Sequence, residues 1–197
     1  MKVTLSWLKD FVNINVPIDV LCAKMVAIGL EIEEVEYLGD KVTNVVVGQI
    51  TALHKHENAD KLQVCQVDIG EGKIVQIVTA ATNIFIGAKV PVSLDGANLA
   101  TGQHITSGML RGVLSEGMFC SGEELGITND YIDGAEVNGI LILDKKSKLG
   151  CDIRKVVGLD DYLLDVNVTA NRPDCNSVYG LAREVAVALG ATCKPLD

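Results

Sequence analysis

A glycine-rich turn between two apolar segments is the feature that most constrains how this chain can fold. Residues 62–69 and 74–78 are rich in Val and Ile, and the turn at 70–73 reads Gly-Glu-Gly-Lys, which predicts a β-hairpin. In the first segment the alternation of apolar positions slips by one residue between Val64 and Cys65. A slip of this kind indicates a β-bulge, which bends a strand as the closure of a barrel requires.

Further short apolar segments surround this hairpin. Strands are predicted at 45–50, 90–94 and 140–143, where Val, Ile and Leu dominate. Little helical periodicity is present between residues 40 and 150, and glycines punctuate the segments. Several short strands joined by glycine turns favour a small β-barrel over a parallel α/β sheet.

The segment before this region, residues 1–39, has a mixed pattern. Apolar spacing predicts a helix over 7–12 with Ser6 as its N-cap, and a second helix over 17–29. Apolar residues set among glutamates at 32–37 predict a strand with one face in water. This segment therefore combines α and β structure.

The last segment, residues 151–197, resembles the first in style. A strand is predicted at 162–168, a polar turn at 171–174 and a helix at 178–189 that ends at Gly190. The predicted fold class is α+β with an all-β insert. A barrel over 40–150 would be inserted into one discontinuous domain made of residues 1–39 and 151–197.

The charge of the chain limits how it can hold nucleic acid. The formal net charge is −9, whereas a domain that binds nucleic acid by electrostatics alone is usually basic. Any contact with RNA must then be local or shape-dependent. The six cysteines form no C-x-x-C pair, which indicates buried thiols in a reducing compartment and predicts no metal site. Neither a signal peptide nor a membrane-length apolar run is present, which predicts a cytoplasmic protein without a membrane partner.

Motifs for catalysis are absent from the sequence. There is no G-x-x-x-x-G-K-[ST] phosphate loop and no G-x-G-x-x-G. Ser115 has no His or Asp nearby in sequence that would suggest a relay. We therefore predict no catalytic residue and no cofactor within this chain.

The first dense polar cluster is the loop 54–61, His-Lys-His-Glu-Asn-Ala-Asp-Lys. Lys55 and Lys61 can contact phosphates, and Asn58 can contact a base edge or a ribose. In the competing interpretation, Asn58 and Asp60 only organise the turn through hydrogen bonds to the backbone.

Two further clusters are found at 110–121 and 171–177. In the first, Arg111 can form paired hydrogen bonds with a phosphate, and the alternative is a turn followed by a buried Met and Phe. In the second, Asn176 or Ser177 can cap the next helix, while Arg172 and Asp174 can contact a neighbouring domain.

Taken together, these clusters resemble a known family. Residues 56–65, 76–83, 110–121 and 124–126 resemble the tRNA-binding domain shared by several aminoacyl-tRNA synthetases and associated factors. The flanks, Leu-Ser-Trp-Leu-Lys-Asp-Phe-Val at 5–12 and Val-Thr-Ala-Asn-Arg-Pro-Asp-Cys at 168–175, are similar to bacterial phenylalanine–tRNA ligase β subunits, as is Gly-Leu-Ala-Arg-Glu at 180–184.

The resemblance implies a fold and a function. The barrel would be an OB-fold, and the chain would be a non-catalytic N-terminal segment that contributes tRNA binding or scaffolding. The whole ligase would use ATP and magnesium in an α2β2 assembly with its α subunit, which holds the aminoacylation site. If the barrel binds tRNA, we expect it to use one face that carries Asn58, Lys61, Asn83, Arg111 and Ser115.

The sequence departs from the family pattern at three places. Family members usually have proline where Glu57 stands, Cys-Gly where Thr79-Ala80 stands, and often lysine near Met109. Each change removes rigidity or positive charge from the proposed RNA face. Over residues 40–150 there are 9 Lys or Arg against 13 Asp or Glu, a net of −4. Two alternatives therefore stay open: a free-standing tRNA-binding or chaperone-like module, and an OB adaptor that binds protein.

Overall fold

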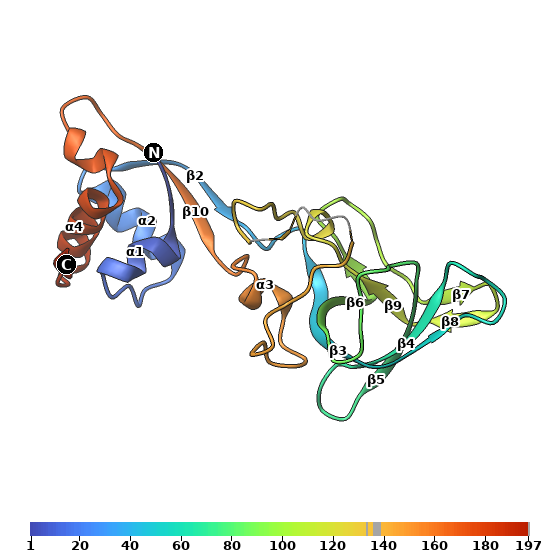
Figure 1. The fold of residues 1–197 in the computed structure, drawn as a ribbon. Helices are drawn as coiled ribbons and strands as arrows, with labels where there is room; N and C mark the ends of the chain where they lie inside the picture. Colours follow the sequence, from blue (N-terminus) through green and yellow to red (C-terminus); the bar gives the residue numbers. More distant parts are fainter. Residues whose placement is uncertain (133, 136–138, 197) are drawn as a thin grey trace. The chain divides into compact units, whose positions relative to one another are not determined.

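The computed structural model describes residues 1–132, 134–135 and 139–196. The chain forms two compact units (Figure 1). Unit 1 combines Met1–Leu38 with the segment that starts at Asp160, and unit 2 is Gly39–Leu159. In the described part of the chain, no helix is both long and apolar enough to cross a membrane.

Unit 1 is a three-stranded antiparallel sheet with helices. Its strand order is β1-β10-β2, so the central strand comes from the C-terminal segment and pairs with two N-terminal strands. This pairing is why the two ends of the chain fold as one unit. Its elements are β1 (Lys2–Thr4), α1 (Leu5–Phe11), α2 (Ile18–Ala27), β2 (Glu31–Tyr37), β10 (Tyr162–Asn167), η2 (Pro173–Asn176) and α4 (Val178–Leu189).

The core of unit 1 lies between the sheet and its helices. Leu8 of α1, Leu21 of α2, Leu164 of β10 and Leu181 of α4 are all fully buried. Burial of apolar side chains from both ends of the chain provides the main force that holds the unit together.

The ends of these helices follow the predictions in part. The predicted helix at 178–189 is confirmed: Ser177 accepts a hydrogen bond from the Gly180 amide, and Gly190 ends the helix at φ 63°. The predicted N-cap of the first helix was wrong. Thr4 is the N-cap, and the Ser6 hydroxyl donates to Asp161 instead.

Unit 2 is built on a curled antiparallel sheet of five strands in the order β5-β4-β3-β6-β9, with a separate β7-β8 hairpin (Figure 1). The predicted hairpin at 62–78 is confirmed as β4 and β5. The elements are β3 (Thr43–Lys55), β4 (Gln63–Asp68), β5 (Ile74–Thr79), β6 (Lys89–Asn98), β7 (Gly108–Leu110), β8 (Val113–Ser115), β9 (Gly117–Phe119), η1 (Glu123–Leu125) and α3 (Ile153–Val156).

The two edge strands of this sheet approach one another. The Glu116 amide donates to the Gln76 carbonyl at 2.8 Å, and the Gln76 amide donates to the Glu116 carboxylate at 2.8 Å. Ile50, Ile77 and Phe119 are buried in the interior that the curled sheet encloses. The sheet therefore curls far enough for hydrogen bonds to join β5 to the segment before β9.

The bulge lies in a different strand from the one predicted. β4 pairs with β5 without a shift of register, whereas the register of β3 against β4 shifts between Ile50 and Ala52. Both Val64 and Cys65 are buried, so the slipped alternation in the sequence reflects burial on both faces of β4. The extra residue, Thr51, donates its hydroxyl to the Gln66 carbonyl across the bulge.

The predicted strand at 140–143 was also wrong. The Leu141 amide donates to the Cys120 carbonyl and the Leu143 amide to the Lys89 carbonyl, so the two hydrogen bonds reach different partners and form no ladder. The end of unit 2 lies after Leu159, later than the predicted boundary at residue 150. Residues 151–159 join unit 2 because the Val47 amide donates to the Cys151 carbonyl and Val46 pairs with Asp152.

Candidate functional site

A buried histidine joins the first two polar clusters. His56 is 5% exposed; its Nδ1 accepts a hydrogen bond from the Asn58 amide at 3.0 Å. Its Nε2 lies 3.2 Å from the carbonyl oxygen of Leu110 in β7. Because Nδ1 is the acceptor, Nε2 carries the proton and donates to that carbonyl. The neutral ring therefore ties the β3–β4 loop to the β7-β8 hairpin.

Sequence reasoning gave His56 no role. A signal was present, because a histidine two residues before an asparagine in a turn can accept from the backbone. What no local pattern shows is the second partner at residue 110, which only the tertiary fold brings near.

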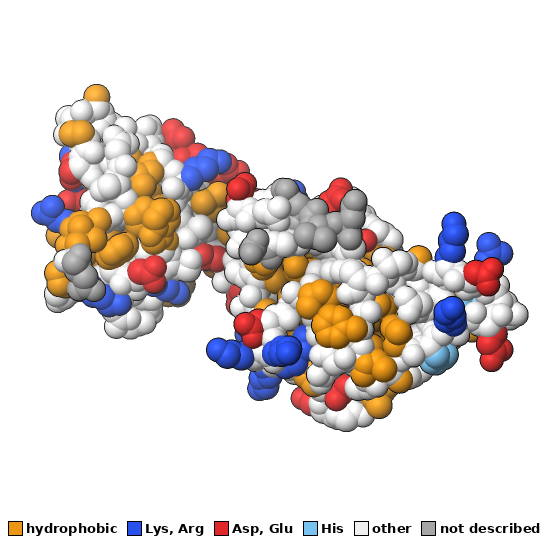
Figure 2. Space-filling view, in the orientation of Figure 1, with side chains coloured by type: hydrophobic (Ala, Val, Ile, Leu, Met, Phe, Trp, Pro, Cys, Tyr) orange, Lys and Arg blue, Asp and Glu red, His pale blue; other side chains and the backbone are white. Residues whose placement is uncertain are grey.

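The predicted cations lie on the two segments that His56 connects. Lys61 and Arg111 are both exposed, the first at the end of the β3–β4 loop and the second in the turn of the β7-β8 hairpin. Asn58 is exposed in the same loop. Figure 2 shows Lys and Arg side chains, with acidic side chains among them, at the end of unit 2 that carries β7 and β8.

Arg111 has an unusual backbone conformation. Leu110 pairs with Val113, which leaves Arg111 and Gly112 as a two-residue turn with φ values of 51° and 90°. Such turns strongly prefer Asn, Asp or Gly at the first position, because a longer L side chain is strained there by about 1 kcal/mol. The turn of the β4-β5 hairpin has the same arrangement, with Glu71 at 55° and Gly72 at 74°.

Two of the residues that we predicted on the RNA face lie further inside. Ser115 is 4% exposed; its hydroxyl accepts from the Val78 amide at 3.0 Å and donates to the Gly117 carbonyl at 2.9 Å. Asn83 is partly buried, and its side-chain amide forms two hydrogen bonds with the backbone of Ile140. Both side chains thus hold unit 2 together.

A cavity of about 460 Å³ opens beside the hairpin. Its walls come from the residue before β4, the end of β5, the segment before the hairpin, β7, the end of β8 and the start of β9. Met109 and Leu110 of β7 line it and are 65% and 46% exposed. The polar residues that line it include Thr79, Gln103 and His104.

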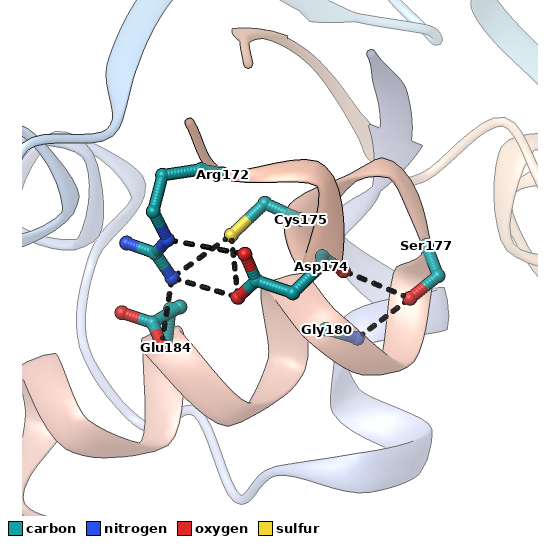
Figure 3. Close-up of polar contacts among 6 residues, drawn as sticks. All are labelled: Arg172, Asp174, Cys175, Ser177, Gly180 and Glu184. Carbon is teal, nitrogen blue, oxygen red and sulfur yellow. Dashed lines mark hydrogen bonds and ion pairs between the residues drawn. The ribbon is translucent and has the colours of Figure 1, made fainter. Parts of the chain in front are cut away.

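The third polar cluster, the Arg172 cluster of Arg172, Asp174 and Glu184, belongs to unit 1 (Figure 3). Arg172 Nη2 lies 2.9 Å from a carboxylate oxygen of Asp174 and 2.9 Å from one of Glu184. Hydrogen bonds from Arg172 hold the pKa of the Asp174 carboxyl at about 2, and the same bonds raise the pKa of Arg172. The cluster fixes the turn before α4 onto the helix.

The cysteines lack the environment of a nucleophile. All six are free thiols. Burial raises the pKa of Cys65 to about 11 and that of Cys120 to about 12, so both stay protonated at neutral pH.

Comparison with known proteins places these features in a family. The model of the family described as "Putative tRNA binding domain" matches residues 45–152. The chain is 44% identical to the phenylalanine–tRNA ligase β subunit of Clostridium acetobutylicum over 96% of its length, and 41% identical to that of Ralstonia nicotianae over 94%. It spans 23% of the length of each of these relatives. The predicted likeness to such β subunits is confirmed.

Solved structures match the chain only weakly. A MetRS related protein from Pyrococcus horikoshii is 19% identical and covers 54% of this chain and 85% of its own, with a TM-score of 0.37. An overlap of this size adds nothing to the family match.

Proposed function

The chain belongs to the family of tRNA-binding domains, and we propose that unit 2 binds tRNA at the end where the β3–β4 loop meets the β7-β8 hairpin. Lys61 and Arg111 would contact phosphates, and Asn58 would contact a ribose or an exposed base. Ser115 and Asn83 would support this face from within, through the hydrogen bonds that hold the sheet edge and the segment at 140.

The observation that carries this proposal is the position of Arg111. A long cationic side chain occupies a turn position where Asn or Gly would be less strained. Arg111 is exposed and forms no ion pair among the residues that the structure describes, so its donors are available to a phosphate. His56 then fixes this arginine's hairpin to the loop of Lys61, so the two cations are held at the same end of the unit.

We also propose that the curled sheet of unit 2 is an OB-fold barrel. The strand order β5-β4-β3-β6-β9, a bulged first strand and the hydrogen bonds between Gln76 and Glu116 all support it. OB-folds bind oligonucleotides over the loop after their first strand and the loop before their last. Those are the loops that carry Lys61 and Arg111.

For the whole protein, we propose a cytoplasmic phenylalanine–tRNA ligase in which this chain is the N-terminal segment of the β subunit. Unit 1 and unit 2 would correspond to its discontinuous domain and its inserted domain. The segment would help position tRNA, and an α subunit would complete an α2β2 enzyme. ATP and magnesium would act elsewhere in the enzyme.

One observation favours a second candidate function. The hairpin exposes Met109, Leu110 and Leu114 on a chain of net charge −9. Exposed apolar groups and negative charge suit a surface that binds protein. In that case the OB-type unit would be an adaptor within the ligase.

Titration with tRNA separates these functions. We expect binding at low salt that weakens about tenfold in both Lys61→Ala and Arg111→Ala, since each removes one charge-assisted hydrogen bond. Lys73→Ala is the matched control, because Lys73 is an exposed cation in the other hairpin turn. Equal affinity of all four proteins would show that the proposed face is wrong. Absence of binding at low salt would favour the adaptor.

A further inference from the structure

The cavity beside the hairpin has a wall that is held in place by a chain of hydrogen bonds. His104 Nδ1 lies 2.8 Å from the side-chain oxygen of Asn98, and the Asn98 side-chain amide donates to the Thr43 hydroxyl at 3.0 Å. The backbone nearby is fixed as well, because the Ile105 amide donates to the Ala97 carbonyl at 2.8 Å. The His104 ring is thereby tied to both β6 and β3.

This chain of bonds also sets which ring nitrogen carries the proton. The oxygen of Asn98 can only accept, so Nδ1 of His104 is the donor. In the neutral ring Nε2 then has no proton and is a hydrogen-bond acceptor. His104 lines the cavity, so the site offers an acceptor held on a fixed ring.

Part of the cavity lining is apolar and exposed. Met109 is 65% exposed and Leu110 46% exposed, both on β7. Two exposed cations are direct chain neighbours of lining residues: Arg111 follows Leu110, and Lys61 precedes Leu62. An apolar lining whose chain neighbours include two cations complements a flat apolar group that has an anionic group attached on each side.

From this geometry we propose that the cavity receives one unpaired nucleobase of the bound RNA. The proposal rests on the proposed function of unit 2 and names the part of the RNA that it reads. The faces of the base would contact Met109 and Leu110, and the flanking phosphates would contact Lys61 and Arg111. Bases that are splayed out of a single-stranded segment can enter such a site, whereas stacked bases of a duplex cannot.

The acceptor on His104 gives the site a preference. Cytosine, adenine and guanine carry an exocyclic amino group that can donate to Nε2, and uracil carries none. Cytosine and uracil have the same size, so the comparison between them isolates this hydrogen bond. One neutral hydrogen bond corresponds to roughly threefold to tenfold in affinity.

The test measures binding of the whole chain to labelled oligo(C) and oligo(U) of equal length, with an RNA duplex of that length as competitor. We expect oligo(C) to bind roughly threefold to tenfold more tightly than oligo(U), and His104→Ala to reduce its affinity to that of oligo(U). Met109→Ser should weaken both. Ile86→Ser is the matched control, because Ile86 is 62% exposed and does not line the cavity. Thermal melts would confirm that each variant is folded.

The outcomes separate this inference from the proposed function. If tRNA binds and depends on Arg111, but oligo(C) and oligo(U) bind equally and Met109→Ser has no effect, the nucleobase site is wrong and the RNA face stands. Equal competition by the duplex would also overturn the nucleobase site. If neither tRNA nor any oligonucleotide binds at low salt, the proposed function fails and the inference falls with it.

Discussion

Two arginines that lie in turns have opposite surroundings in this protein. Arg172 in unit 1 contacts the carboxylates of Asp174 and Glu184 at 2.9 Å each (Figure 3). Arg111 in unit 2 lies exposed in a strained hairpin turn, and no carboxylate of the described residues forms an ion pair with it. One guanidinium is neutralised within the fold, and the other is left available to an anion.

The difference contrasts a cation whose donors the fold satisfies with one that we propose for binding. Paired hydrogen bonds to carboxylates satisfy the donors of Arg172, which leaves little for a ligand. Arg111 occupies a strained turn position, as Glu71 does in the other hairpin, and forms no ion pair among the described residues, so its donors stay available to an anion.

Of the changes proposed here, Gly180→Ala should cause the largest loss of stability, in the turn that carries Arg172. A Cβ at this position would lie 1.8 Å from the Asp174 carbonyl oxygen, so the turn would have to move away from α4. We expect a loss of about 3 kcal/mol in the free energy of unfolding, measured by urea titration. Gly108→Ala is the control, because its Cβ would meet no atom within 4 Å. Equal stability of both variants would contradict the close packing of this turn.

Ser115→Ala should lower the stability of unit 2, the unit that carries Arg111, because this residue's hydroxyl is buried. Removal leaves the Val78 amide without its acceptor in a buried position, at a cost of about 1–3 kcal/mol. Ser177→Ala on the other side removes only a helix cap, at a cost of about 1 kcal/mol. Urea titrations of both variants would compare these two losses in the free energy of unfolding. A Ser115→Ala protein that is as stable as the parent but fails to bind tRNA would instead support direct contact of this hydroxyl with RNA.

Acid should weaken the Arg172 cluster through Asp174. The pKa of this carboxyl is lowered in the folded state, so its contribution is complete above its usual value and is lost as the pH falls from 3.8 to about 2. We expect thermal stability to fall over that range, and less steeply in Asp174→Asn. Glu33→Gln removes another exposed carboxylate of unit 1 as a control. Identical acid profiles for Asp174→Asn and the parent would show that the pair contributes nothing.

The elements that local sequence determines were predictable. The apolar stripe and terminal glycine of α4 and the turn of the β4-β5 hairpin are properties of adjacent residues, and both are confirmed. The positions of the bulge and of the first N-cap depend on pairing across the fold. The extra residue of the bulge is Thr51 in β3 and does not lie in β4. Ser6 does not cap the first helix, because its hydroxyl donates to Asp161.

The candidate site was predictable only as a set of residue types. The exposed positions of Lys61 and Arg111 agree with a surface role, but the burial of Ser115 follows from its bond to Val78, which is distant in sequence. His56 was missed for the same reason, since its second partner is Leu110. Neither the positive φ of Arg111 nor the pairing of Arg172 with Glu184 can be derived from residue spacing alone.

The most direct test of the contrast is the salt dependence of tRNA affinity in Arg111→Asn, measured beside Glu71→Asn. Both changes place asparagine in the same turn conformation, so both should raise the free energy of unfolding by up to about 1 kcal/mol. Only Arg111→Asn should also weaken tRNA binding, with the slope of log K against log salt falling by roughly 0.7–0.9 for one lost phosphate contact. Equal slopes for Arg111→Asn, Glu71→Asn and the parent would contradict the assignment of Arg111 to RNA.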